Sequence, residues 1–283
     1  MSKVYDLITN KILEKLERGV IPWQMPWRSQ MPKNLITKKP YRGINILLLS
    51  FSDYKSPYWL TYKQAKDLKG VVKAGAKGTP IVYWNIARVL PKDTEDEAER
   101  LIPFLKYHTV FNVEQCEKIP VPKDDLIEFK PIDECEKVIS TMPKRPVINE
   151  GRNRACYIPS RDVVEMPDRA VFKSVEGFYS TLFHELVHST GHTSRLNRNS
   201  INEPHAFGSE TYSKEELIAE IGGSFVCGMT GISNQTLEGN ASYISNWLQR
   251  LRNDKKLIIT AASHAQKACD FILNRIQRGD ISK

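Results

Sequence analysis

The segment 181–192 constrains this chain more than any other, because it contains the pattern His-Glu-x-x-His. His184 and His188 are four positions apart, so on an α-helix their imidazoles lie on one face, one turn apart. In that arrangement two histidines can bind one metal ion, and Glu185 can accept a proton from an attacking water. Apolar residues on either side of the motif favour a buried helix, and Gly191 favours its end there.

A third metal ligand is expected on a second helix, predicted over residues 212–225 with Ser213 as its N-cap. Glu216 and Glu220 are four positions apart and share a face of this helix. The segment resembles the Glu-x-x-x-Asp helix of the thermolysin-like gluzincins, with Glu in place of Asp. The resemblance implies that Glu216 is the third ligand and that Glu220 holds a ligating histidine in its working tautomer. Two histidines and one carboxylate are typical of a catalytic zinc site, although manganese or cobalt fits the same ligands.

Other interpretations of these residues stay open. Glu216 could be only a helix-capping residue, and Glu215 and Glu220 only solvated surface; the pairing on two helices favours a metal site. A metzincin site fits less well, because its third histidine would fall at Ser194, whereas His192 directly follows the glycine. A hydrolytic site would also need a group that stabilises an oxyanion. The sequence does not choose among its three candidates for that role, Tyr157, Tyr212 and His192.

Length and composition indicate a two-domain cytoplasmic protein. The chain has 283 residues, and no apolar run is long enough to cross a membrane or to resemble a signal peptide. Its five cysteines contain no Cys-x-x-Cys pair, which favours reduced thiols over a disulfide framework or a thiolate metal site.

Charge and aromatic residues concentrate in the N-terminal third. Residues 1–92 contain 17 Lys and Arg against 5 Asp and Glu, and they include four of the five tryptophans. Cations interleaved with aromatic rings are typical of a groove for single-stranded nucleic acid, in which lysines follow the phosphates and rings stack on bases. We expect about half of these rings to be core residues instead, with Trp84 the foremost of them.

The order of elements predicts an α+β protein. Helices are expected over residues 3–18, 43–50 and 61–70, followed by strands over 81–90 and 104–113 that flank a solvated acidic run at 93–99. A hairpin over residues 154–167 precedes the two metal helices, and two further helices follow, over residues 241–252 and 257–278.

Segments along nearly the whole chain resemble ArdC-type antirestriction proteins. The N-terminal resemblance rests on residues 8–12, 19–27, 41–45, 59–64, 72–78 and 111–115, and the C-terminal resemblance on residues 179–198, 215–220 and 243–247. It implies a mixed α/β single-stranded-DNA-binding domain at 1–125, a linker at 126–145, and a mainly helical zincin-like domain with a small β-sheet at 146–283. It also implies a protein of a plasmid, integrated element or phage that coats incoming single-stranded DNA against host restriction.

From these patterns together we predict the residues that contact nucleic acid. They are Trp23, Trp27, Arg28, Lys38, Lys39, Tyr41, Arg42, Asn45, Trp59, Lys63, Gln64, Lys73 and Lys77.

Two functional hypotheses from different classes follow. In the first, the DNA groove localises a metallopeptidase that cuts a protein of the host restriction or DNA-associated machinery. In the second, the protein protects by coating DNA, and its metal site is structural or vestigial. Glu185 favours the first hypothesis, because a structural site has no need of a glutamate between its histidines. Neither hypothesis involves a membrane.

Overall fold

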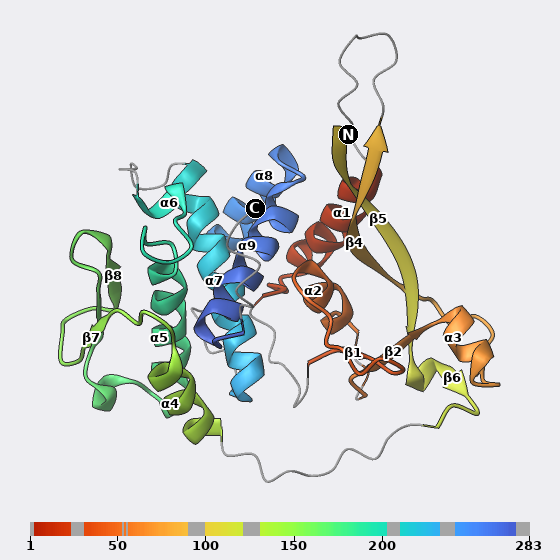
Figure 1. Ribbon diagram of the computed structural model, residues 1–283, viewed down its shortest axis with the longest axis horizontal. Helices are drawn as coiled ribbons and strands as arrows, with labels where there is room; N and C mark the ends of the chain where they lie inside the picture. The colour runs from red at the N-terminus through yellow and green to blue at the C-terminus, as the bar shows by residue number, and fades with distance from the viewer. Residues whose placement is uncertain are drawn as a thin grey trace. The chain divides into compact units, whose positions relative to one another are not determined.

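The computed structural model describes residues 3–23, 31–52, 54, 56–89, 100–120, 131–202, 210–232 and 241–275, and it is an α+β protein (Figure 1). The chain divides into two compact units. The first comprises Met1–Lys11 and Pro32–Pro122, and the second comprises Ile12–Met31 and Lys123–Lys283. No helix in the described part combines the length and apolar character that crossing a bilayer requires.

The N-terminal unit is built on a four-stranded sheet of order β1-β2-β5-β4. Its strands are β1 (Lys33–Asn34), β2 (Tyr58–Thr61), β4 (Thr79–Val89) and β5 (Arg100–Asn112). The strands β4 and β5 pair antiparallel over their length, from Thr79 opposite Val110 to Val89 opposite Arg100 (Figure 1). The strand β2 pairs with the last residues of β5, where Thr61 lies opposite Val110. Both long strands therefore lie where the sequence predicts them.

Short helices complete this unit. They are α1 (Lys3–Glu17), which begins in the N-terminal unit and ends in the other, α2 (Ile44–Ser50), α3 (Tyr62–Asp67) and η1 (Val113–Gln115), with a second sheet of β3 (Val71–Val72) and β6 (Cys116–Glu117). Thr61 and Gln64 form a capping box that starts α3 directly after β2. Asn45 of α2 exchanges two side-chain hydrogen bonds of 2.7 Å with the backbone of Val82, which fixes α2 on β4.

The C-terminal unit is mainly helical. Its elements are α4 (Pro131–Thr141), β7 (Val147–Asn149), β8 (Cys156–Ile158), η2 (Pro159–Arg161), β9 (Val163–Glu165), η3 (Arg169–Val171), α5 (Val175–Ser189), α6 (Asn199–Asn202), α7 (Glu210–Thr230), α8 (Ala241–Asn253) and α9 (Leu257–Ile272). The three strands form a small sheet of order β7-β9-β8, in which β8 is an edge strand. Figure 1 shows α7 between α5 and α9, and α5 contacts β8 and β9.

Two glycines allow the metal-motif helix α5 to approach α7 closely. A Cβ atom at Gly223 would lie 3.3 Å from the backbone of His184, and one at Gly222 would lie 2.9 Å from Val187. The start of α7 differs from the expectation. The helix begins at Glu210, so Ser213 is a buried residue inside it and not its N-cap.

Residues 12–31 belong to the C-terminal unit, whereas we expected one N-terminal domain over residues 1–125. Trp23 is fully buried there, with its ring edge-to-face against Trp247 at 5.8 Å and its indole N–H 3.3 Å from the hydroxyl of Tyr243. Glu17 forms an ion pair of 2.7 Å with Arg252. The N-terminal segment thus packs on α8, more than 200 residues away along the chain.

Candidate metal site and nucleic-acid interface

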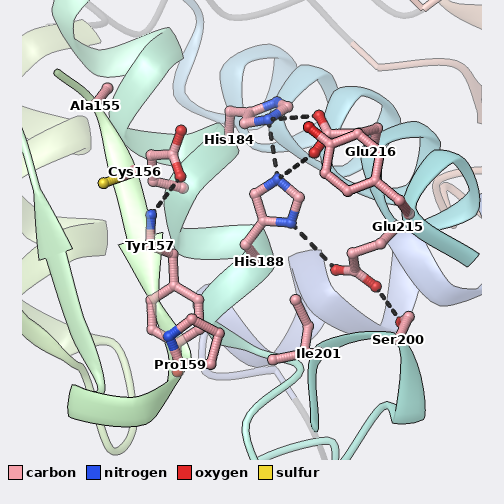
Figure 2. A pocket seen from close by; sticks show the side chains of 12 residues that line it. Ala155, Cys156, Tyr157, Pro159, His184, His188, Ser200, Ile201, Glu215 and Glu216 are labelled. Atoms are coloured by element: carbon pink, nitrogen blue, oxygen red, sulfur yellow. Dashed lines mark hydrogen bonds and ion pairs between the residues drawn. The ribbon is translucent and has the colours of Figure 1, made fainter. Parts of the chain in front are cut away.

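Two helices bring His184, His188 and Glu216 together. The Nε2 atoms of the histidines are 3.1 Å apart, and each lies 3.6 Å from an oxygen of the Glu216 carboxylate. Figure 2 shows both imidazoles and this carboxylate turned toward a common point. One ligand atom from each residue lies within 4.8 Å of the others, and in the described part of the chain this is the one such group of metal-ligating side chains.

The charges in this group stabilise one another: the carboxylates favour protonated histidine, and the histidines favour ionised carboxylate. Burial lowers the pKa of His184, but the hydrogen bond to Glu216 and the charges of Glu220 and Glu185 outweigh it and raise the pKa to about 9. Burial raises the pKa of Glu216, but the two histidines lower it by more, so the net direction is down. A cation at this point would be favoured by the surrounding carboxylates, which is the electrostatics that a metal site requires.

Glu215 contacts His188 on the side of the ring that faces away from Glu216. Its Oε1 lies 3.4 Å from Nδ1 of His188, the ring nitrogen that faces away from Glu216 (Figure 2). Arg198 donates to both oxygens of Glu215, at 2.5 and 3.0 Å, and Ser200 donates a further hydrogen bond. Burial raises the pKa of Glu215, but His188 and Arg198 outweigh it and lower the pKa to about 2. The side chain is therefore an ionised, buried carboxylate that fixes the orientation of the imidazole.

The sequence left the role of Glu215 open. Glu215 is buried and contacts His188, so it is not solvated surface. The expectation that Glu220 holds a ligating histidine stays a prediction. Glu220 is also buried; it accepts a hydrogen bond of 3.3 Å from Tyr243, and its charge raises the pKa of His184. The signal that could have identified Glu215 was Arg198, one of two arginines between the two helices.

Glu185 faces a pocket of about 390 Å³ that the three clustered residues also line. Its Oε2 accepts a 2.8 Å hydrogen bond from the backbone N–H of Tyr157 on the edge strand β8. That bond orients the carboxylate and leaves its other oxygen for a further partner. The thiol of Cys156 points away from the histidines in Figure 2, so it does not join them.

The three oxyanion candidates differ in position. The hydroxyl of Tyr157 donates to Asp162 at 2.9 Å and accepts from Arg195 at 3.2 Å, so its hydrogen bonds are already made to other residues. His192 is hydrogen-bonded to Ser194 and does not line the pocket. Tyr212 lines the pocket, and its hydroxyl hydrogen-bonds Glu216. Burial, followed by the charge of Glu216, raises the pKa of Tyr212 to about 12, so it remains a proton donor at neutral pH.

The predicted DNA-binding residues divide into several groups. Trp27 and Arg28 lie outside the described residues. Trp23 and Trp59 are 0% and 2% exposed, so neither ring has a face that a base could reach. Asn45 is used to hold β4, as described above. These buried positions correct the expectation that the tryptophans stack on bases.

A second group is brought together in a basic turn after β1. Asn34 accepts hydrogen bonds from the backbone N–H groups of residues 36 and 37, and its amide donates to Gln64 at 3.2 Å and to Tyr41 at 3.5 Å. This turn presents the exposed side chains of Lys38 and Lys39, and Nζ of Lys38 lies 4.7 Å from the centroid of the Tyr58 ring. Asn34 was not predicted, and it is the residue that ties Tyr41 and Gln64 to the turn.

The remaining predicted cations are exposed. Arg42, Lys63 and Lys77 reach solvent, and Lys73 donates from Nζ to the backbone carbonyl of Glu114 at 2.9 Å. They remain candidates for phosphate contacts.

Comparison with known proteins gives matches to both units. Residues 2–111 match the family model of the N-terminal domain of the anti-restriction factor ArdC, and residues 134–264 match a zincin-like metallopeptidase family. A DNA primase TraC of Escherichia coli is 34% identical over 95% of the chain, but the chain spans only 27% of that protein. The uncharacterized protein y4eC of Sinorhizobium fredii (strain NBRC 101917 / NGR234) is 32% identical over 95% of the chain and 91% of its own length.

The fold also has solved relatives. The metal-free crystal structure of the antirestriction ArdC protein from the R388 plasmid has a TM-score of 0.79 and 35% identity, over 98% of this chain and 100% of that one. The Mn(II)-bound structure of the same protein has a TM-score of 0.76 and 34% identity, over 98% and 99% of the two chains.

Proposed function

The chain belongs to the ArdC family of antirestriction proteins, and from that premise we propose that it binds single-stranded DNA and protects it from host restriction. The observation that carries the proposal is the match to the R388 protein over 98% of the chain, which includes both units. The basic, aromatic N-terminal third supports single strands as the ligand, because unpaired bases offer faces for stacking and phosphates attract lysines.

The binding test uses a fluorescent single-stranded oligonucleotide, an unlabelled duplex of matched sequence as competitor, and a salt series. We expect preference for the single strand and an affinity that falls steeply with salt, because phosphate contacts release counterions. Equal affinity for both forms, or no binding, would remove the DNA part of the proposal.

We further propose that His184, His188 and Glu216 hold a divalent metal, with zinc as the native ion and manganese or cobalt as possible replacements. Two imidazoles and a carboxylate within 4.8 Å fit such an ion, and the Mn(II)-bound relative supports a metal in this fold. Bound there, the metal would polarise a peptide carbonyl and acidify a water molecule.

The other residues of the pocket would supply the remaining chemistry of peptide hydrolysis. Glu185, oriented by the N–H of Tyr157, would accept a proton from the attacking water and return it to the leaving amine. Tyr212 would donate a hydrogen bond to the oxygen on which charge develops. Glu215 and Arg198 would keep His188 in one orientation. The substrate class we propose is a protein of the host restriction or DNA-associated machinery.

The test of hydrolysis is the Glu185→Gln variant, which keeps the shape of the side chain and removes the base. We expect it to lose cleavage of an unfolded protein probe such as casein by about 100-fold or more and to retain its single-strand affinity. Protection of incoming plasmid DNA in cells would be measured in parallel. Full protection by the variant would mean that hydrolysis is dispensable and that the protein acts by coating DNA.

A further inference from the structure

The large aromatic side chains found exposed are tyrosines, whereas the predicted Trp23 and Trp59 are buried. Three large exposed side chains carry rings: Tyr62 at 63%, Tyr107 at 53% and Tyr83 at 37% exposed. All three belong to the N-terminal unit, whereas the large hydrophobic side chains exposed in the C-terminal unit are valines. A base that stacks on this protein therefore has three rings available within one unit.

The sheet register places the three tyrosines within a few residues of one another along the strands. Val110 of β5 has Thr61 of β2 on one side and Thr79 of β4 on the other. Tyr62 follows Thr61 directly, at the start of α3. Tyr107 lies three residues before Val110, about 10 Å along the strand. In Figure 1 the end of β2 is where α3 leaves the sheet and β4 and β5 continue as a pair.

Beyond that point, β5 is open on one side. The pairing with β2 ends at Val110, so in the described part of the chain residues 106–109 have β4 as their only strand neighbour. These four residues are all exposed, although they alternate between the two faces of the ribbon. Lys106 and His108 share the face of Tyr83, whereas Tyr107 points to the opposite face together with Val82, whose side chain is buried. Exposed rings therefore lie on both faces of the ribbon along the open side of β5.

One of the rings is already held in position. Tyr83 stacks on His108 of the neighbouring strand, with 4.8 Å between ring centroids and 10° between their planes, and its hydroxyl is hydrogen-bonded to that imidazole. A base placed on the outer face of this pair would extend an existing stack, so little side-chain freedom would be lost on binding.

The charges around these rings are mainly positive. Residues 56–67, 71–89 and 100–114 contain seven Lys and Arg against two acidic residues, Asp67 and Glu114. Three of these cations are exposed and adjacent to the rings: Lys63 follows Tyr62, Lys77 precedes the start of β4, and Lys106 lies opposite Tyr83. The occupant that this charge favours is a polyanion, and the open rings favour one with unpaired bases.

We propose that single-stranded DNA is held on this tyrosine surface, defined by Tyr62, Tyr83 and Tyr107 with Lys63, Lys77 and Lys106. The inference rests on the proposed DNA binding and names the residues that perform it. The strand passes along the open side of β5, where bases stack on Tyr107 on one face of the ribbon and on the Tyr83–His108 pair on the other. Tyr62 supplies a third ring at the start of α3, and the lysines contact phosphates. Trp59 is a buried residue of the same unit, whereas Trp23 is buried in the other unit.

The experiment uses the full chain and a labelled single-stranded oligonucleotide that contains 2-aminopurine, whose fluorescence is quenched by stacking. We expect each of Tyr62→Ala, Tyr83→Ala and Tyr107→Ala to lower affinity by roughly 5- to 100-fold and to reduce the quenching. The corresponding Tyr→Phe variants keep the ring, and we expect them to bind within about twofold of the parent.

Matched controls separate stacking from general damage. Val71→Ala removes an exposed apolar side chain of the same unit, and Lys137→Gln removes an exposed cation of the other unit; neither should change binding. Lys106→Gln should lower the salt slope by about one counterion. Circular dichroism checks that each variant is folded.

The outcomes are distinct. If the parent protein binds and the alanine and Lys106→Gln variants bind equally well, this surface is not the binding site, while the proposed function stands. If an alanine variant does not fold, the Lys106→Gln variant decides, and an unchanged salt slope counts against the proposal. If the parent itself does not bind single strands, the proposed DNA binding fails and the surface assignment fails with it.

Discussion

At the scale of single residues, the metal cluster depends on two adjacent glutamates that face different partners. Glu216 meets both Nε2 atoms, while Glu215 lies against Nδ1 of His188 and is held by Arg198. An imidazole held on its far side keeps the tautomer that leaves Nε2 available for a metal. The neighbouring position is therefore as important to the cluster as the ligand position itself.

We predict that Glu215→Gln weakens zinc binding by about 10- to 100-fold, because the amide holds the imidazole less well than a carboxylate. The measurement is zinc transfer to a chromogenic chelator, with Glu176→Gln as the control at a partly buried position in the first turn of α5. Glu215→Ala should also destabilise the protein by about 3–5 kcal/mol, since it leaves Arg198 buried without its carboxylate. Unchanged zinc affinity in Glu215→Gln would show that the carboxylate has no positioning role.

We predict that Tyr212→Phe lowers the turnover of any hydrolysed protein substrate by about 100-fold, because the developing oxyanion loses a donor. Zinc affinity should change much less, because Glu216 loses one hydrogen bond but stays between the two histidines. Tyr157→Phe is the comparison. Its hydroxyl contacts Asp162 and Arg195, so that variant should lose thermal stability and keep turnover. The reverse pattern would assign the oxyanion to Tyr157.

The limits of sequence reasoning are also clearest at this scale. The spacing of His184, Glu185 and His188 is local to one helix turn, so it predicts a shared face directly. The choice between Glu215 and Glu220 depends on how α7 is rotated against α5, and no local pattern encodes that rotation. Similarly, tryptophan is a residue type that often stacks on bases, as predicted for Trp23 and Trp59. Whether such a side chain is buried, however, depends on residues far away in the sequence.

At the scale of elements, Arg169 joins three parts of the C-terminal unit. Its guanidinium contacts Glu136 of α4 at 2.8 Å and Glu150 after β7 at 3.0 Å, and it lies 4.5 Å from the centroid of the Phe178 ring on α5. Tyr179 of α5 also donates to Glu136. The small sheet and α4 are thereby fixed against the helix that carries the two histidines.

This connection predicts a pH dependence. The hydrogen bond from Tyr179, and then those from Arg169, hold the pKa of Glu136 below its ordinary value of 4.5. Because the folded-state pKa is lowered, the ionised carboxylate stabilises the fold above about pH 4.5, and the contribution is lost as the pH falls through the lower value. Glu136 is half exposed, so solvent screening limits the effect to about 1 kcal/mol.

The measurement is urea unfolding of the parent and of Glu136→Gln at several pH values. The difference between them should be largest near pH 6 and should vanish toward pH 3. A difference that is equal at both pH values would contradict an ionic contribution from this carboxylate.

The sequence predicted the positions of helices and strands better than the contacts between them. The strands β4 and β5 follow from short runs rich in β-branched and aromatic residues, and α3 follows from its capping pair, because both signals are short-range. The start of α7 at Glu210 was missed because serine is a common N-cap residue, although Ser213 is in fact buried inside the helix.

At the scale of the whole molecule, the N-terminal segment has a structural role in the C-terminal unit. We predict that Trp23→Ala destabilises that unit by about 3–5 kcal/mol, since it removes a fully buried indole that contacts Trp247 and Tyr243. Single-strand affinity of the folded variant should be unchanged. Urea unfolding followed by circular dichroism, with oligonucleotide binding in the same preparation, measures both; normal stability with weakened DNA binding would restore Trp23 to the DNA interface.

The packing of Trp23 against α8 also sets an order of events during synthesis. Trp23 and Tyr243 are separated by 220 residues, so a ribosome adding about 5–20 residues per second completes the second roughly 10–45 s after the first. Over that interval the indole lacks its contacts with Trp247 and Tyr243, and Glu220 lacks its hydrogen bond from Tyr243. The metal-type cluster can therefore reach its final stability only once nearly the entire chain has been translated.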